Sequence, residues 1–462
     1  MGKRESRTTM NMTQGQSMKL LLLFALPLMF GSIFQQAYTV VDTAIVGRGV
    51  GMNALASLGI VDWLNWLIFS VAQGFTQGIS IMVSQKFGEG DMKAIPKIAG
   101  QGALLMVIIT VFLTAAGVTG IPHFLRLMNA PEELRPLAAL YSTILFGGFA
   151  ASAFYNFTAS MLRAEGDSRT PLIAMIAASL TNIALDSLTV FVLKWGIAGA
   201  AVSTVLAQFL AGVICAVRMW KIPELRFRLS DMRFTKSISK ELLRLSFPVS
   251  AMNLIISIGG VFVQSIVNTF GVNFIAGYTS TNKLYGLLEI AAVSYGYAVT
   301  TYVGQNYGAS DLLRITKGVR SAAFLSVATS AVIGLVMIVF GQRILSLFLT
   351  ASDAQAYAEA MSAAYTFLVI MASCLPILYM LYVYRSALQG MGHTKEAMIS
   401  GFIEFFMRVG LAVIVMFTHF GRGLFIAEIA AWLGAAVFLA AHYYMLRARL
   451  AKQGISGASD HP

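Results

Sequence analysis

Long apolar runs, separated by short polar stretches, follow one another along nearly the whole chain. They are centred near residues 30, 68, 108, 150, 180, 208, 257, 290, 330, 372, 410 and 434. A helix of about 20 apolar residues, rising roughly 1.5 Å per residue, crosses a hydrocarbon core of about 30 Å. The pattern therefore predicts an all-α polytopic membrane protein with about twelve transmembrane helices and no large soluble domain between them.

Composition agrees with this reading, because 57% of the 462 residues are hydrophobic and only 12% are charged. These values exclude an ordinary soluble domain. The first apolar run is too long for the core of a signal peptide and lacks a small-residue cleavage site after a short apolar region. We therefore expect it to be the first span and expect no cleaved targeting segment.

The net charge of +12 reflects membrane topology. If the N-terminus is cytoplasmic, most Lys and Arg residues fall in cytoplasmic segments, as the positive-inside rule requires. Both termini are then cytoplasmic, and we expect no nucleic-acid binding. The exceptions are Arg48, Arg126, Arg135, Lys194, Arg343 and Arg422 outside, and Lys283 and Arg408 within spans.

The chain contains an internal repeat at an offset of about 220 residues. "VSQKFGEGD" (Val83–Asp91) matches "VGQNYGASD" (Val303–Asp311), and "SMLRAEGDSRT" (Ser160–Thr170) matches "SALQGMGHTKE" (Ser386–Glu396). Each half holds about six spans, and an even number returns the chain to its starting side, so the halves are parallel repeats. We predict an N-lobe (1–225, spans 1–6), a cytoplasmic linker (226–240) and a C-lobe (241–462, spans 7–12), with a central cleft between the lobes.

The join between the halves, Lys221–Arg244, carries seven Lys and Arg residues and is partly amphipathic. It is either a lipid-binding or regulatory helix, or a linker that obeys the positive-inside rule. Composition alone favours the linker.

One carboxylate, Asp42, is the sole charged side chain between Leu20 and Gly47. An ionisable residue within a span costs roughly 2.5 to 3.5 kcal/mol on insertion scales, and such residues usually face a cavity or a partner. Asp42 lies roughly 9 Å from the outer end of span one. Asp186 and Thr204 lie roughly 12 Å from the same surface on spans five and six, and Asn182 lies one turn deeper than Asp186 on the same helix face.

We predict that these four residues, Asp42, Asn182, Asp186 and Thr204, form one cluster. Two carboxylates, an amide oxygen and a hydroxyl are hard oxygen ligands, which suit Na⁺ or a proton and not a soft metal. The cluster is therefore predicted to be a cation switch. The alternatives are a polar core that holds helices together by hydrogen bonds and, for Asp42, a place at the outer interface.

Other charged residues within spans are candidates for the substrate cleft. Asp62 lies at a similar depth on span two and either joins the cluster or lines the cleft. In the second half, Lys283 and Glu289 are candidates for substrate binding or lobe closure, whereas Arg408 stands at i,i+4 from Glu404 and can simply pair with it.

No sequence motif points to catalysis or to a bound cofactor. The chain has no G-x-x-x-x-G-K-[S/T], H-E-x-x-H or G-x-S-x-G motif, so neither ATP hydrolysis nor hydrolase chemistry is expected. Cys215 and Cys374 stand alone in separate apolar segments, which indicates small core residues without a disulfide or metal role.

Together these features resemble the multidrug and toxic compound extrusion (MATE) family, within the multidrug/oligosaccharidyl-lipid/polysaccharide flippase superfamily. The resemblance covers nearly the whole chain. It rests on "LPLMFGSIFQQAYTVVDTAIVGR", "VSQKFGEGD", "TYVGQNYGAS", "LRAEGDSRTPL" and the two six-helix halves.

The resemblance implies a V-shaped, two-lobed antiporter that expels small organic, often cationic compounds in exchange for Na⁺ or H⁺ across a prokaryotic plasma membrane. Membrane lipids surround such a protein, and we expect a monomer. The family's cation-site positions match Asp42, Asn182, Asp186 and Thr204, and Tyr38 and Gln35, on the same helix as Asp42, join the candidates for the cleft. The acidic C-lobe site of another branch has no clear counterpart, because Lys283, Glu289 and Arg408 make that lobe mixed in charge.

Two other classes remain open. A flippase for lipid-linked oligosaccharides or other lipids would share the repeats, but we would expect more spans or a strongly basic cleft. A channel or a membrane-embedded enzyme fits less well, because no filter-like loop or catalytic constellation is present.

Overall fold

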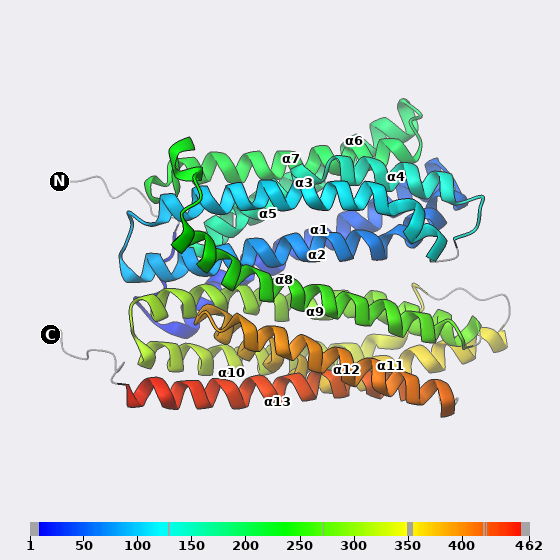
Figure 1. Ribbon diagram of the computed structural model, residues 1–462. Coiled ribbons are helices and arrows are strands. Elements are labelled where there is room, and N and C mark those ends of the chain that lie inside the picture. Colours follow the sequence, from blue (N-terminus) through cyan, green and yellow to red (C-terminus); the bar gives the residue numbers. More distant parts are fainter. Residues whose placement is uncertain are drawn as a thin grey trace. The chain divides into compact units, whose positions relative to one another are not determined.

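The structure is a computed structural model that describes residues 9–127, 130–270, 272–348, 354–418, 421 and 423–453. Arg422, one of the outer basic residues in the predicted topology, lies outside this part. Within it, every regular element is a helix (Figure 1). In the first half these are α1 (Ser17–Gly49), α2 (Met52–Glu89), α3 (Ile95–Leu127), α4 (Arg135–Gly147), α5 (Phe149–Ala164), α6 (Arg169–Asp186), η1 (Ser187–Val192), α7 (Ile197–Lys221), η2 (Pro223–Leu225) and η3 (Leu229–Met232). The second half contains α8 (Lys236–Val267), α9 (Val272–Gly308), α10 (Leu312–Leu345), α11 (Ala354–Gly390), α12 (Thr394–Thr418) and α13 (Gly423–Lys452).

The helices account for the predicted spans. Among the described residues, ten helices are long and apolar enough to cross a membrane, and α4 with α5 makes an eleventh span that bends by 46°. The remaining long helix, α9, has 37 residues but is more polar, because Lys283 and Glu289 lie on it. Counting α9 gives six spans in each half, which confirms the all-α fold with about twelve transmembrane helices.

The sequence repeat is also a structural repeat. Helix α2 ends at Gly90 with a φ of 76°, and Ser310, at the equivalent place after α9, has a φ of 57°. The next residues, Asp91 and Asp311, each accept a hydrogen bond from the backbone N–H three positions on, at 3.3 and 2.8 Å. Equivalent residues therefore make equivalent turns, as expected for a duplicated unit.

The chain divides into two compact units, and each includes part of the other half's first helix. One unit contains 1–11 and 26–250, and the other contains 12–25 and 251–462. Helices α1 and α8 therefore each belong partly to one unit and partly to the other. Each has a proline two residues from that boundary, Pro27 in α1 and Pro248 in α8. Proline removes a backbone hydrogen bond and allows a helix to bend there.

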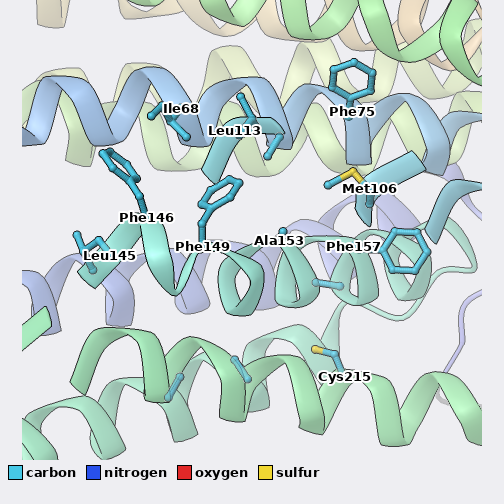
Figure 2. Close-up of a cluster of buried hydrophobic side chains, with 14 of the residues drawn as sticks. Ile68, Phe75, Met106, Leu113, Leu145, Phe146, Phe149, Ala153, Phe157 and Cys215 are labelled. Carbon is cyan, nitrogen blue, oxygen red and sulfur yellow. The ribbon is translucent and has the colours of Figure 1, made fainter. Parts of the chain in front are cut away.

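The first unit is held together by a continuous apolar core between α2, α3, α4, α5 and α7 (Figure 2). Phe69 on α2 meets Phe149 on α5 edge to face, with ring centroids 5.1 Å apart. Where α4 passes into α5, Gly148 lets α7 approach, because a Cβ there would lie 2.4 Å from a methyl group of Val205. Cys215 lies buried in this core, as a small apolar residue would.

The second unit has a core of stacked aromatic rings. Phe367 on α11 stacks on Tyr278 of α9 and on Phe425 of α13, with centroid distances of 4.9 and 4.6 Å. Phe274 stacks on Phe425 at 5.7 Å. Three helices distant in sequence are thereby joined by apolar contact.

Candidate functional site

Helices α1 and α6 run side by side in the first unit, which sets the relative height of the residues they carry. A Cβ at Gly31 of α1 would lie 3.7 Å from Cα of Leu172, and one at Gly49 would lie 2.4 Å from a methyl group of Val190 in η1. The number of residues from Gly31 to Gly49 equals the number from Leu172 to Val190, so the two segments run parallel. This register places Asp42, which lies between the two glycines, level with the last turn of α6.

Asp42 and Asp186 form a buried carboxylate pair within this contact. Asp42 is 8% exposed and Asp186 is fully buried, and their carboxyl groups lie close enough for one proton to bridge them. As carboxylates, neither can donate to the other. Accordingly, Oδ1 of Asp42 and both carboxylate oxygens of Asp186 have no hydrogen-bond donor among the residues that the structure describes.

Asn182 and Thr204 complete the predicted cluster. Asn182, one turn before Asp186 on α6, donates from Nδ2 to Thr204 Oγ1 on α7 at 3.5 Å, a long contact. Its own Oδ1 is buried without a donor. The Thr204 hydroxyl donates to the carbonyl of Ala200 at 3.0 Å, which leaves one lone pair available beyond the one that faces Asn182. Asp42 thus lies beside Asp186, Asn182 contacts Thr204, and Asn182 and Asp186 stand one turn apart on α6.

A change of helix type occurs directly after Asp186. The chain continues as the π-helical segment η1, and Thr189 on it shares a hydrogen bond of 3.2 Å with Ser203 on α7. The wider π turn frees local backbone groups, and such segments occur frequently at functional sites. Ser203 lies near the Asp186 carboxyl group, but its hydroxyl donates to the carbonyl of Gly199 at 2.9 Å.

The electrostatic surroundings of the pair favour a cation. No ion pair among the described residues includes Asp42 or Asp186. Two buried negative charges without a basic partner are costly unless a cation or a proton neutralises them. The donor set of two carboxylates, an amide oxygen and a hydroxyl fits Na⁺ or H⁺. Groups of three or more His, Cys, Asp or Glu that could hold a metal ion do not occur in the described part of the chain.

The nearby cleft candidates differ in position. Tyr38 is half-buried, lies one turn before Asp42 and has its hydroxyl near Gln208 of α7. Gln35 and Asp62 are exposed. Tyr141 on α4, which the sequence did not nominate, is buried and lies within electrostatic range of Asp42, Asp186, Asp62 and Tyr38.

In the second unit, the nominated charges differ in exposure and in their direct partners. Lys283 is exposed on α9. Glu289, on the same helix, accepts hydrogen bonds from the hydroxyls of Tyr285 and Tyr382. Arg408 belongs to an ion-pair network on α12 and its neighbours, and two members of that network, Glu404 and Glu428, lie within electrostatic range of Glu289.

That network is balanced in charge. Arg408 pairs with Glu428 of α13 at 2.7 Å and with Glu404 at 3.8 Å, and Arg385 of α11 pairs with the other oxygen of Glu404. The i,i+4 pairing of Glu404 and Arg408 is therefore present. Arg385 and Glu428 were missed, because nothing local to their sequence shows that three helices converge there.

Comparison with known proteins extends over most of the chain. Residues 27–188 and 248–414 match the MatE family. The chain is 28% identical over 425 residues to a probable multidrug resistance protein, YpnP, of Bacillus subtilis (91% of this chain, 90% of that protein). It is 31% identical over 342 residues to another, YoeA, from the same organism (72% and 73%).

Two further similarities concern cargo and fold. An FAD transporter of Shewanella oneidensis is 23% identical over 340 residues (72% of this chain, 74% of that protein). A solved structure of a MOP superfamily transporter from Pyrococcus furiosus superimposes with a TM-score of 0.88 at 24% identity, covering 97% of this chain and 100% of that one.

Proposed function

This chain belongs to the MatE family, and on that premise we propose that it is a secondary active multidrug efflux antiporter. It exports small organic, often cationic compounds in exchange for Na⁺ or H⁺ by alternating access. The names of the Bacillus subtilis relatives support multidrug export. Because one relative is an FAD transporter, the substrate of this protein has to be measured directly.

One observation carries the ion coupling: Asp42 and Asp186 are buried together, and three of their carboxylate oxygens have no hydrogen-bond donor in the described part of the chain. A purely structural polar core would satisfy its buried oxygens with hydrogen bonds. Oxygens that lack donors and face one another are suited to a cation or a shared proton.

The residues then have distinct roles. Asp42 and Asp186 supply the charge that the cation neutralises, and Asn182 and Thr204 supply neutral oxygens. Cation binding removes the repulsion between the carboxylates and so stabilises the arrangement in which α1, α6 and α7 are packed together. Loss of the cation restores the repulsion and favours separation of α1 from α6. Gln35, Tyr38 and Asp62 remain candidates for substrate contact in the first unit, and Lys283, Glu289 and Arg408 remain separate candidates in the second.

The setting is a prokaryotic plasma membrane, with both termini in the cytoplasm and the protein working as a monomer. The positive-inside distribution of Lys and Arg supports this orientation. The coupling ion takes the place of a cofactor, and no catalytic step is required.

Transport by the reconstituted protein tests the proposal. Proteoliposomes would receive a fluorescent organic cation such as ethidium, with a Na⁺ gradient or a proton gradient imposed separately. We expect one gradient or both to drive accumulation against the substrate gradient, and Asp42→Asn to abolish that response. Glu132→Gln is the matched control, because its side chain is 90% exposed. Accumulation by Asp42→Asn at the native rate would refute coupling at this site.

A further inference from the structure

The segment between α7 and α8 packs against the rest of the first unit (Figure 1). A Cβ at Gly100 of α3 would lie 2.8 Å from the backbone of Asp231, so only a glycine allows η3 this close. Gln101 Oε1 accepts hydrogen bonds from the Thr235 N–H at 3.1 Å and from the Ser239 hydroxyl at 3.0 Å. The segment therefore has a defined orientation on α3.

The docking point lies at the depth of the lipid headgroups. Helix α3 has 33 residues, which at about 1.5 Å each is roughly 20 Å longer than the hydrocarbon core. About 10 Å at each end therefore extends into the interfacial layer. Gly100 and Gln101 lie roughly 8 to 9 Å from the start of α3, just before its apolar stretch begins.

At this depth the segment exposes large apolar side chains. Leu229 is 86% exposed and Phe234 is 55% exposed. Trp220, in the last turn of α7, is 54% exposed and meets Phe227 edge to face. Aromatic side chains are enriched at membrane interfaces, and such exposure to water would be unfavourable.

Basic side chains lie between these apolar ones. Arg228, Arg233, Lys236 and Lys240 are all exposed. The ion pairs among the described residues include none of the four. A linker that only obeyed the positive-inside rule would need the charges, but it would need neither the exposed Leu229 and Phe234 nor the fixed docking on α3.

We propose that the segment from Trp220 to Lys240 is a binding surface for anionic lipid headgroups of the leaflet on that side of the membrane, the cytoplasmic one in the proposed orientation. Leu229 and Phe234 insert among the upper acyl carbons, and Arg228, Arg233 and Lys236 bind phosphate groups. Each basic side chain near an anionic surface contributes about a fivefold increase in partitioning.

Environment-sensitive probes at single cysteines test the surface. In the Cys215→Ala, Cys374→Ala background, nitrobenzoxadiazole would be attached at Leu229→Cys or Phe234→Cys, and at Lys93→Cys as an exposed control before α3. The full-length protein would be reconstituted in phosphatidylcholine vesicles with or without phosphatidylglycerol. Spin-labelled lipid and acrylamide would serve as the membrane and aqueous quenchers.

We expect the probes at 229 and 234 to be quenched by the spin-labelled lipid, more strongly with phosphatidylglycerol present, and the probe at 93 to be quenched by acrylamide. Changing Arg228, Arg233 and Lys236 together to Gln should raise severalfold the phosphatidylglycerol fraction needed for half of the effect. Changing Lys93 and Lys97 to Gln should not.

Two outcomes would overturn the proposal. Acrylamide quenching at 229 and 234 as strong as at 93 would mean that the surface faces water and is open to a soluble partner. Equal lipid quenching with and without phosphatidylglycerol would mean that the charges do not bind headgroups. Neither result depends on transport, so failure of this proposal would leave the proposed antiport untouched, and failure of the antiport would leave this proposal untouched.

Discussion

At the scale of single residues, the decisive feature is a buried pair of carboxylates, three of whose four oxygens have no hydrogen-bond donor among the described residues. Asp42 and Asp186 could be predicted from the sequence, because each interrupts an apolar run and helix rise places both at a similar depth. Ser203 and Tyr141 could not, because hydroxyls are common in spans and only packing shows which ones face the pair. Arg385 and Glu428 were missed for the same reason.

If the two aspartates act as one site, their substitutions should not be additive. Asp42→Asn and Asp186→Asn should each abolish cation-dependent efflux, and the double variant should be little worse than either one. Cation binding to purified protein checks this. Losses of binding free energy that add up in the double variant would indicate two independent sites.

A second carboxyl group gives a pH-dependent prediction. Glu165, in the turn after α5, is 2% exposed. Burial, assisted by the nearby Glu224 carboxylate, raises its pKa to about 8 from 4.5. The folded state therefore binds more protons than the unfolded state between these values, so this group's contribution to stability falls as pH rises from about 4.5 through about 8.

Glu165→Gln should remove that contribution. The melting temperature of the purified variant in detergent should depend less on pH over this range, and it should exceed the native value most clearly at the alkaline end. Glu89→Gln, at the exposed last residue of α2, is the control. An unchanged pH profile for Glu165→Gln would show that the carboxyl group is not buried as a neutral acid.

At the scale of elements, the contact between α1 and η1 holds the two aspartates at one height. The apolar pattern predicts the long helices, but it gives no sign of the π-helical turn after Asp186 or of the bend at Gly148. Both depend on contacts with α7, through Thr189 and Val205, that are remote in sequence. The repeat turns were predictable because Asp91 and Asp311, and the glycines three residues before them, recur at a fixed offset.

Gly49→Ala tests the contact between α1 and η1. The added Cβ would lie 2.4 Å from Val190 and 2.9 Å from Phe191, and overpacking of this kind typically costs about 1 to 3 kcal/mol. Melting temperature and cation affinity should both fall. Gly120→Ala on α3, which has no atom within 4 Å of its added Cβ, should be neutral or slightly stabilising. Equal behaviour of the two variants would contradict the close contact.

The ion pairs of the network in the second unit should be energetically coupled. Glu404→Leu leaves Arg385 buried without its partner, and breaking a buried pair in this way costs about 3 to 5 kcal/mol. Removing both charges, in Arg385→Leu with Glu404→Leu, should restore part of the loss of melting temperature. A double variant less stable than Glu404→Leu alone would indicate that Arg385 stabilises the fold through other contacts.

At the scale of the whole molecule, two repeats carry unlike interiors. In the first unit, two neighbouring buried carboxylates have no basic partner among the described residues. In the second unit, buried Arg and Glu residues form ion pairs of balanced charge, and Glu289 accepts hydrogen bonds from two tyrosines. The duplication was visible in the sequence. The pairing that distinguishes the two interiors was only partly visible, since Glu404 and Arg408 are four residues apart but their other partners lie on different helices.

Linkage between cation and substrate tests the central claim most directly. A ligand shifts a conformational equilibrium only through its differential affinity for the two states, and coupling between two sites is reciprocal. Coupling free energies are typically about 1 to 3 kcal/mol, or roughly five- to 150-fold in affinity. The measurement is the affinity of purified protein for an organic cation such as ethidium, with Na⁺ and pH varied separately, in the native protein and in Asp42→Asn. The account predicts that one ion or both weaken substrate binding to the native protein within that range, and that neither ion changes substrate binding to Asp42→Asn. A native affinity that is independent of both ions, or an equal response in Asp42→Asn, would contradict the account.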